Sequence, residues 1–331
     1  VETDAIQILV NEVGVSQIYQ EGQFRIQSKT GYGIVSDILS RGVGSVTRTF
    51  ELVTGSILVN QKVSTYIDIH PSNVTLQRLA QNYPIERKKF NTELGRNKAI
   101  LVGEKSENWV IIVHGFKGNS IDSVRLNYWD TYLKHNWRVF SIELRNDINN
   151  PLDPSNRIQW GLHERYDIES AINYAKSNGA KNIMLHGVSF GGQVVLNYLA
   201  LTTDSTDVSG VILDATSVSV KDNVQHLSSI AYPTLPKMMF DFVFKFTELK
   251  YGIEFDQFNV LNHLSSTNVP ALFIHSKNDN WCPFELVQDL QTRFKGPQYT
   301  FFVESDKHAT EPNIDPEGYV RSIQQFIDEF N

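Results

Sequence analysis

The feature that most constrains the fold of this chain is a Gly-x-Ser-x-Gly pentapeptide, residues 187–191, between a strand pattern and a helix pattern. The apolar run at residues 183–185 predicts a buried strand, and residues 193–200 have the apolar spacing of a packed helix. A strand, a tight turn centred on a serine and a helix together form a nucleophile elbow. Glycine at both flanking positions avoids collisions with the strand and the helix. Ser189 is therefore predicted to stand above the sheet at a helix N-terminus, which favours developing negative charge.

A nucleophilic serine requires a base and an acid, and both are predicted downstream of Ser189. Its hydroxyl is not ionised at neutral pH, so a histidine must take the proton and an acid must hold that histidine in one tautomer. The strand pattern at residues 270–275 is followed by Asp279, and the pattern at residues 299–303 by a loop with His308. The chain order serine, acid, histidine is that of hydrolases with a nucleophile elbow. The predicted triad is Ser189, Asp279 and His308.

Asp214 is the alternative acid, because it also ends an apolar strand pattern. The turn at residues 276–279 matches the usual acid loop more closely and favours Asp279. Two further histidines lie near these motifs: His186 precedes the elbow and His275 closes a strand pattern. Both are expected to be packed and hydrogen-bonded rather than catalytic.

An oxyanion site is predicted after the buried strand pattern at residues 108–113, which ends in His114, Gly115 and Phe116. Backbone N–H groups stabilise an oxyanion best when they are already aimed at it in a site poor in water. The expected donors are the N–H groups of Phe116 and of Phe190, the residue after the nucleophile. His114 is expected to be a structural hydrogen-bonding residue.

Taken together, these segments resemble the α/β-hydrolase superfamily, and within it the bacterial single-domain serine esterase-like hydrolases. Residues 139–145 and 161–167 match two further family segments. The first resembles a strand that ends in Asp-x-Arg-Gly-His-Gly, but here Glu143 stands at the aspartate position and Asn146-Asp147 replace the Gly-His-Gly. The local loop shape is therefore expected to differ. The resemblance covers roughly residues 85–331 and implies an α/β fold, with a mostly parallel sheet flanked by helices.

Two regions lie outside the motifs. Residues 1–85 are expected to form a helical N-terminal extension, because apolar residues between 34 and 53 recur at helical spacing. Packing on the hydrolase body is favoured over a lipid or partner contact, since basic residues do not cluster there. The hydrolase domain is expected over residues 86–331, with a helical cap insertion at about 216–268 whose length exceeds a simple crossover.

The cap insertion is the predicted source of substrate contacts. Its segment 236–246 is dense in aromatic residues and methionine. Met238, Phe240 and Phe244 are predicted to line an apolar pocket over the nucleophile, which would favour an acyl or aromatic substrate. The alternative is that these side chains pack the cap onto the core.

Composition excludes several other classes of protein. A net charge of -7 argues against nucleic-acid binding, which rewards a basic face. The single cysteine, Cys282, rules out an intramolecular disulfide and a thiolate metal cluster. No apolar run approaches the roughly 20 residues of a membrane span, and no signal peptide is seen. A cytoplasmic location is slightly favoured, but the start at Val1 leaves a removed targeting segment and an extracytoplasmic location open.

The sequence therefore predicts a serine hydrolase that cleaves a small-molecule carboxylic ester through an acyl-enzyme, with no metal or organic cofactor. A peptidase or amidase with the same triad is the alternative among enzymes. A non-catalytic binding or signalling protein of the same fold is less expected, because it would not need all three triad residues. The sequence makes no prediction of the oligomeric state.

Overall fold

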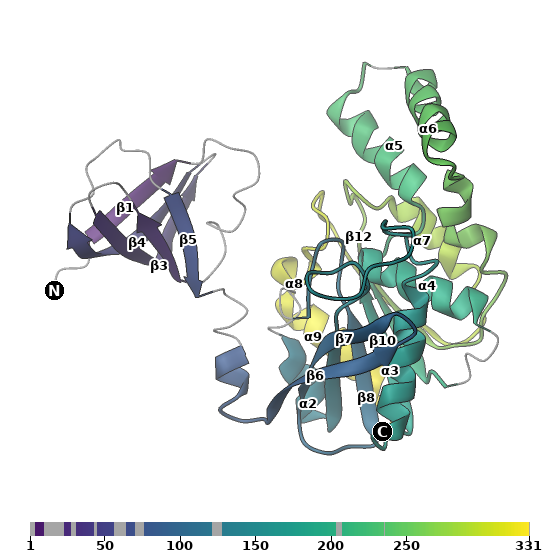
Figure 1. Cartoon of the computed structure of the whole chain (residues 1–331), viewed down its shortest axis with the longest axis horizontal. Coiled ribbons are helices and arrows are strands. Elements are labelled where there is room, and N and C mark those ends of the chain that lie inside the picture. The colour runs from purple at the N-terminus through teal and green to yellow at the C-terminus, as the bar shows by residue number, and fades with distance from the viewer. Residues whose placement is uncertain are drawn as a thin grey trace. The chain divides into compact units, whose positions relative to one another are not determined.

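The computed structural model describes residues 4–9, 23–27, 31–42, 45–55, 64–69, 76–120, 128–202, 207–234 and 236–330. The chain divides into two compact units, Val1–Asn82 and Tyr83–Asn331 (Figure 1). This division lies close to the predicted boundary after residue 85.

The first unit contains a β-sheet, and the prediction of a helical extension is wrong for it. Its five strands are β1 (Asp4–Leu9), β2 (Gln23–Gln27), β3 (Gly31–Gly42), β4 (Ser45–Gly55) and β5 (Ser64–Ile69), and they lie in the order β1-β4-β3-β2-β5. All neighbouring strands are antiparallel. Among the described residues of this unit, only 76–79 are helical.

The helical spacing of apolar residues between 34 and 53 was misleading because strand-forming signals outweigh it. Gly42 and Gly44 interrupt the segment, and each costs a helix interior about 1 kcal/mol relative to alanine. Valine, isoleucine, threonine and phenylalanine between them favour strands. The segment accordingly folds as the hairpin β3–β4, which Gly42 and Ser45 close as partners.

The second unit is built on an eight-stranded, mostly parallel sheet in the order β13-β12-β11-β10-β8-β9-β7-β6. Its strands are β6 (Ile85–Thr92), β7 (Gly95–Val102), β8 (Asn108–Val113), β9 (Trp137–Ile142), β10 (Asn182–Val188), β11 (Gly210–Asp214), β12 (Ala271–Ser276) and β13 (Gln298–Val303). Strand β7 is antiparallel to both of its neighbours, and the pairs from β9 to β13 are parallel. The predicted α/β class is confirmed.

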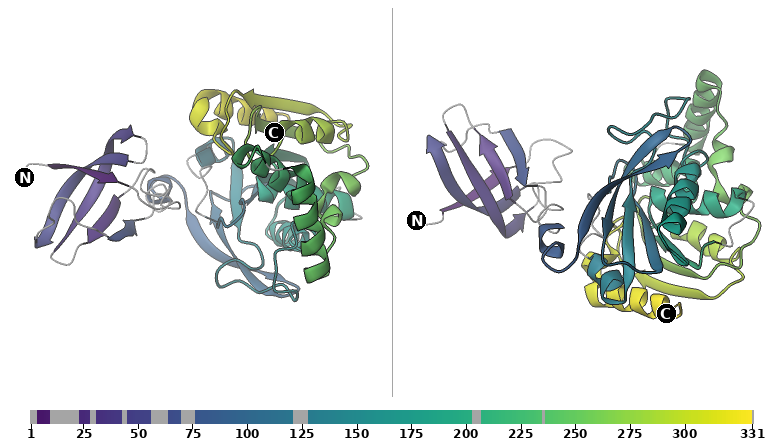
Figure 2. Two further views of the ribbon diagram at one scale, coloured as in Figure 1. Left: turned by 90° about the horizontal axis from the view of Figure 1, so that it is seen from above. Right: turned by 60° about the horizontal axis from the view of Figure 1, so that its bottom comes forward.

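Helices cover both faces of this sheet (Figure 2). The helices of this unit are α2 (Trp129–Lys134), α3 (Arg165–Ser177), α4 (Phe190–Leu201), α5 (Val220–Ala231), α6 (Lys237–Tyr251), α7 (Phe284–Gln291), α8 (Glu311–Ile314) and α9 (Pro316–Asp328). Helix α3 contacts α4, and α2 contacts α9. No helix of the described ranges combines the length and the apolar character needed to cross a bilayer.

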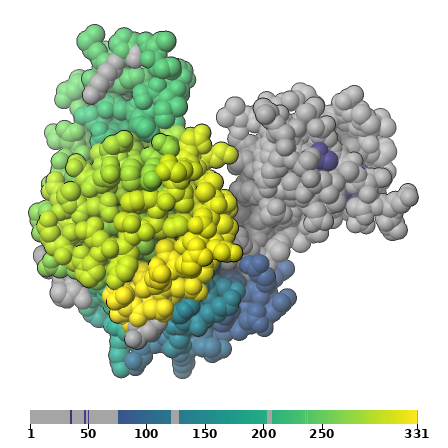
Figure 3. Space-filling view, turned by 180° about the vertical axis from the view of Figure 1, so that it is seen from behind, coloured from purple at the N-terminus to yellow at the C-terminus, as the bar shows by residue number. Residues whose placement is uncertain are grey.

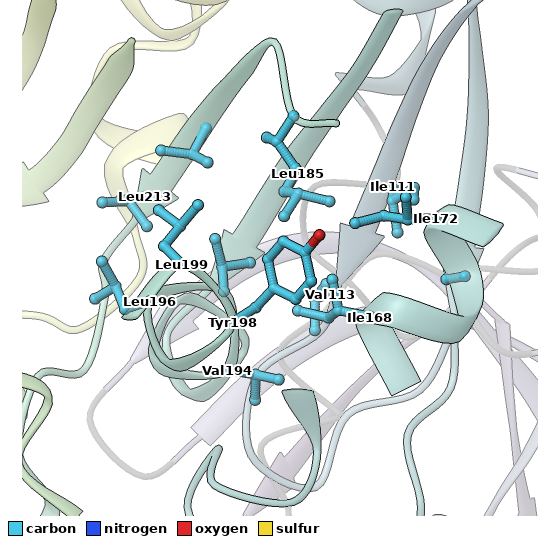
Figure 4. Packing of buried hydrophobic residues seen from close by; sticks show 14 of the residues in the cluster. Ile111, Val113, Ile168, Ile172, Leu185, Val194, Leu196, Tyr198, Leu199 and Leu213 are labelled. Atoms are coloured by element: carbon cyan, nitrogen blue, oxygen red, sulfur yellow. The ribbon is translucent and has the colours of Figure 1, made fainter. Parts of the chain in front are cut away.

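One large core cluster lies between the sheet and the helices α3, α4 and α7. Strand residues alternate between the two faces, so Ile111 and Val113 of β8 join one cluster with Ile168 of α3 and Val194 of α4 (Figure 4). Tyr198 packs within the same cluster. Strand β8 is buried on both faces, as expected for a central parallel strand.

The segment between β11 and β12 is helical, as predicted for the insertion at about 216–268. It contains α5, α6 and the 3₁₀ turns η3 (Phe255–Phe258) and η4 (Val260–Asn262). Helices α5 and α6 project from the rest of the unit (Figures 1 and 3). Six large apolar side chains on α6 are half exposed or more: Met238, Met239, Phe242, Val243, Phe246 and Leu249.

A buried ion-pair network joins the two family-like segments at residues 139–145 and 161–167. The guanidinium of Arg145 donates to Asp167 Oδ1 at 3.0 Å and lies 3.5 Å from Asp153 Oδ2, with all three side chains buried. Burial alone would lower the pKa of Arg145, but the hydrogen bonds and charges of Asp167 and Glu93 raise it. This network ties the loop after β9 to the start of α3.

Replacing Arg145 by methionine should lower the free energy of unfolding by roughly 3–5 kcal/mol, because the buried carboxylate of Asp167 would lose its cationic partner. Arg321→Met is the matched control. Arg321 pairs with Glu317 on an exposed face of α9, and its loss should cost less than about 1 kcal/mol. Urea unfolding of both variants measures the difference, and equal midpoints would contradict this account of the network.

Candidate active site

Ser189 occupies a strained turn between β10 and α4, with φ 53° and ψ -115°. A side chain at Gly191 would place Cβ 2.1 Å from the carbonyl oxygen of Val113, and one at Gly187 would come within 2.6 Å of the carbonyl oxygen of Gly191. Contacts this close require glycine at both positions. The backbone therefore has the geometry of a nucleophile elbow.

Ser189, His308 and Asp279 form a continuous hydrogen-bonded chain in the structure. The Oγ of Ser189 lies 2.7 Å from Nε2 of His308. The Nδ1 of His308 lies 2.8 Å from Oδ2 of Asp279. With a proton on Nδ1 donated to the carboxylate, Nε2 is free to accept the hydroxyl proton of Ser189. The three residues come from the ends of β10, β12 and β13, as the sequence pattern predicts.

Asp279 is held as a carboxylate in a buried position, with 1% of its surface exposed. Its Oδ1 accepts hydrogen bonds from the backbone N–H of Trp281 at 2.7 Å and of Cys282 at 2.9 Å. Burial opposes ionisation, but the hydrogen bond and charge of His308, with a smaller contribution from His275, hold the pKa of Asp279 below its usual range. Asp279 is therefore ionised at neutral pH.

Asp214, the alternative acid, belongs to a different cluster. Its Oδ2 accepts a hydrogen bond from the hydroxyl of Tyr319 at 2.8 Å and lies 3.3 Å from Nε2 of His186. The structure brings Asp279, and not Asp214, to His308. The arrangement also agrees with the expectation that His186 is packed and hydrogen-bonded.

The loop after β8 passes directly against Ser189, where the oxyanion donors are predicted. Val113 pairs with Gly187 across β8 and β10, and a Cβ on Gly115 would lie 3.4 Å from Cβ of Ser189. Outside the helices and strands of the described chain, no backbone hydrogen bond uses the N–H of Phe116 or Phe190 as its donor. Phe190 begins α4, where N–H groups lack a partner within the helix.

His114 holds this loop in place. Its Nε2 lies 2.8 Å from Oδ2 of Asp147, and its Nδ1 lies 2.8 Å from the carbonyl oxygen of Gly115. Burial opposes protonation, but the hydrogen bond and charge of Asp147 outweigh it and raise the pKa of His114. Asp147 is one of the two residues that replace the Gly-His-Gly of the resembling family, and it supplies a partner that sequence reasoning missed.

A cavity of about 380 Å³ opens beside Ser189. Its lining residues come from the loop after β8, the loop before α3, the elbow, the cap and the two loops that carry Asp279 and His308: His114, Gly115, Phe116, Gly118, Trp160, Val188, Ser189, Phe190, Ser217, Val220, Asn223, Val224, Leu227, Trp281, Cys282, His308 and Ala309. Apolar side chains dominate this lining, as is usual for small-molecule sites.

The cap contributes α5 to this cavity and not α6, which corrects the predicted substrate contacts. Met238 is 77% exposed, Phe240 is half-buried, and Phe244 is buried against Phe255 with ring centroids 4.8 Å apart. None of the three lines the cavity. Helix α5 lies closer because it follows β11 directly, and the N–H of Ser217 in the connecting loop donates to the carbonyl oxygen of Ser189 at 3.0 Å.

Two tryptophans in the cavity wall were missed by sequence reasoning. Trp160 stacks on Phe116, with ring centroids 5.5 Å apart, and meets Phe190 edge-on at 5.7 Å. Trp281 stacks on His308 at 6.2 Å. Their positions carried a weak signal, since Trp160 directly precedes the family-like segment at 161–167 and Trp281 follows Asp279 by two residues. In the described part of the chain, no group of three or more His, Cys, Asp or Glu residues is placed to hold a metal ion.

No protein-family model matches the chain. The uncharacterized protein YqkD of Bacillus subtilis is 26% identical over 232 residues, which cover 68% of this chain and 72% of YqkD. Another relative, the uncharacterized protein YfhR of Escherichia coli, is 26% identical over 203 residues, and the match spans 62% of its length.

Solved structures with a similar fold include the esterase Pf2001 of Pyrococcus furiosus, with a TM-score of 0.57 and 19% identity. That match covers 76% of this chain and 92% of the esterase. The α/β hydrolase GrgF of a Penicillium species aligns with a TM-score of 0.58 and 18% identity, over 74% of this chain and 98% of GrgF. The chain therefore has the α/β-hydrolase fold.

Proposed function

We propose that the protein is a serine hydrolase that cleaves carboxylic ester bonds through an acyl-enzyme intermediate. The observation that carries this proposal is the hydrogen-bonded chain from Ser189 Oγ through His308 to Asp279, with links of 2.7 and 2.8 Å. A fold alone does not define an activity, but a nucleophile, a base and an orienting acid in this geometry do define a reaction class.

In the first half of the proposed reaction, Ser189 Oγ attacks the ester carbonyl carbon as Nε2 of His308 takes the hydroxyl proton. Asp279 keeps the Nδ1 proton of His308 in place and stabilises the imidazolium that forms. The N–H groups of Phe116 and Phe190 are proposed to donate to the resulting oxyanion. Collapse of the tetrahedral intermediate breaks the bond to the alcohol oxygen, which takes its proton from His308.

In the second half, water attacks the acyl-Ser189 ester. His308 takes a proton from this water and returns it to Oγ of Ser189 as the carboxylic acid leaves. Asp279 has the same role in both halves, since its low pKa keeps it ionised throughout.

The proposed substrate is a small ester with an apolar acyl or aromatic group. Support comes from the lining of the 380 Å³ cavity, in which Phe116, Phe190 and Trp160 lie beside Ser189. Pf2001 of Pyrococcus furiosus, whose solved structure has a similar fold, is an esterase. A charged or sugar-like substrate would leave its polar groups without partners against such a wall.

Ester and amide cleavage can be separated by a matched pair of substrates, a p-nitrophenyl ester and a p-nitroanilide with the same acyl group. The ester should have a kcat/KM larger by roughly 10²–10⁴, because the anilide nitrogen must be protonated by a general acid before it can leave. Absorbance at fixed enzyme concentration measures both. A larger kcat/KM for the anilide would identify the protein as an amidase and not an esterase. If folded protein turned over neither substrate, the non-catalytic alternative would be favoured.

A further inference from the structure

A second cavity, of about 320 Å³, adjoins the wall of the first. Trp160 lines both cavities. The other residues of the second cavity come from the loop before α3, the end of α6 and the turn η3: Arg157, Ile158, Gln159, Tyr251, Ile253, Phe255 and Phe258. Trp160 is thus the residue common to Ser189's cavity and to a second hollow beside the end of α6.

Two polar side chains of the second cavity, Arg157 and Gln159, each bond to another part of the protein. Arg157 donates from Nη1 to the carbonyl oxygen of Tyr251 at 3.2 Å, and its guanidinium lies over the Tyr251 ring at 5.0 Å. Gln159 donates from Nε2 to Oγ of Ser155 at 2.6 Å. The remaining surface is that of isoleucine, phenylalanine, tyrosine and tryptophan side chains. It therefore suits an aliphatic chain better than a polar ligand.

Trp160 is held in place by its neighbours. Its φ is +49°, an uncommon value for a residue with a side chain. Its carbonyl oxygen accepts a hydrogen bond from Asn197 at 3.4 Å. A Cβ on the next residue, Gly161, would lie 2.6 Å from Nδ2 of Asn197, so the backbone here is pressed against α4. Its ring also stacks on Phe116, so both the backbone and the side chain of Trp160 are held in position beside the cavity.

The position of Trp160 indicates which half of a bound ester would extend toward it. The leaving alcohol takes its proton from His308 in the proposed reaction, so the alcohol lies on the side of His308, whose ring stacks on Trp281. Trp160 instead contacts Phe116 and Phe190, the proposed oxyanion residues. The chain that extends toward Trp160 is therefore the acyl chain.

We propose that Trp160 sets the maximum acyl-chain length of the enzyme, and that the second cavity is an apolar subsite that receives a longer acyl chain once the indole no longer separates the two cavities. This inference rests on the proposed esterase function. It names a specificity-determining residue outside the triad and a second site for the aliphatic part of the substrate.

The test compares wild type with Trp160→Ala on p-nitrophenyl esters of straight-chain acids, from acetate to palmitate. Each methylene that becomes buried should raise kcat/KM about fourfold. Wild type should rise and then fall at one chain length. Trp160→Ala should continue to rise for at least two further methylenes, roughly a 16-fold gain at that length. An unchanged optimum in folded Trp160→Ala would overturn the proposal.

A blocking variant shows whether the extra chain enters the second cavity. Ile253 lines that cavity and not the first, so adding Ile253→Trp to Trp160→Ala should restore the wild-type optimum. A double variant that keeps the longer optimum would contradict the proposed subsite. Melting temperatures confirm that each variant is folded. Trp160→Gly, which suits a positive φ, replaces Trp160→Ala if the latter does not fold.

A binding measurement separates this inference from the proposed function. In a Ser189→Ala background, titration with decanoate and then with longer straight-chain carboxylates reports chain binding without catalysis. Trp160→Ala in that background should tighten the longer chains by about fourfold per methylene. If this holds while wild type hydrolyses no ester, the chain subsite stands and the esterase proposal fails. Chain-independent affinity would overturn the subsite whatever the hydrolysis result.

Discussion

Replacing Ser189 by alanine should lower kcat for ester hydrolysis by roughly 10⁶-fold, the loss typical of removing the nucleophile from a serine hydrolase. The alanine side chain has no atom that can form the acyl-enzyme. The fold should be retained, because the substitution removes one hydroxyl at the cavity surface and leaves the backbone turn intact. Initial rates on a p-nitrophenyl ester, with the melting temperature of the same preparation, measure both effects.

Ser217→Ala is the matched control for this variant. Ser217 lines the same cavity, but its hydroxyl donates to Oε1 of Gln193 at 2.6 Å and accepts from Asn223 at 2.8 Å, so its role is structural. Its loss should change kcat less than about tenfold, through shifts in the surrounding residues. Similar rates for Ser189→Ala and Ser217→Ala would mean that Ser189 is not the nucleophile.

Replacing Asp279 by asparagine should lower kcat by roughly 10⁴-fold, because an amide group toward Nδ1 of His308 would favour the wrong imidazole tautomer. The N–H groups of Trp281 and Cys282 would still find an acceptor in the amide oxygen. The side chain should therefore keep its position, and the effect should be on kcat.

Asp214→Asn is the matched control for the acid. Asp214 bonds to Tyr319 at 2.8 Å and has no place in the chain that leads to Ser189. Its substitution should lower stability, with a far smaller effect on the kcat of the folded protein. If Asp214→Asn were the more damaging of the two for kcat, the acid would have to be reassigned.

The meeting of Ser189, Asp279 and His308 could be predicted because it depends on chain order and on strand ends. Parallel strands place their carboxyl ends at one edge of the sheet, so residues that follow β10, β12 and β13 must approach one another. The elbow could be predicted because a side chain at position 187 or 191 would collide with the backbone of the neighbouring strand or helix, so only glycine fits there.

The lining of the cavity could not be predicted in the same way. An amphipathic or aromatic segment shows that a helix packs, but not which neighbour it packs against. Met238, Phe240 and Phe244 have the composition of a pocket wall, yet the cavity is lined by Val220, Val224 and Leu227 of α5 and by no residue of α6. Trp160 comes from a loop before α3 whose course depends on the long-range contacts of Gly161 with α4.

In the N-terminal unit, the periodicity of apolar residues alone predicted a helix where the chain forms strands. Apolar residues between 34 and 53 fit a helical spacing, but glycine content and β-branched residues favour the hairpin β3–β4. A strand with irregular register, as between Val35 and Ile38, lacks the strict alternation that would have identified it.

Covalent trapping by a fluorophosphonate, which reacts with activated serine hydroxyls, would show directly whether Ser189 is the nucleophile. A single adduct is expected on the peptide that contains Ser189, found by mass spectrometry. Labelling should be absent in Ser189→Ala and strongly slowed in His308→Ala. Folded protein that leaves Ser189 unmodified, or that is labelled at another serine while Ser189→Ala still hydrolyses esters, would contradict the account.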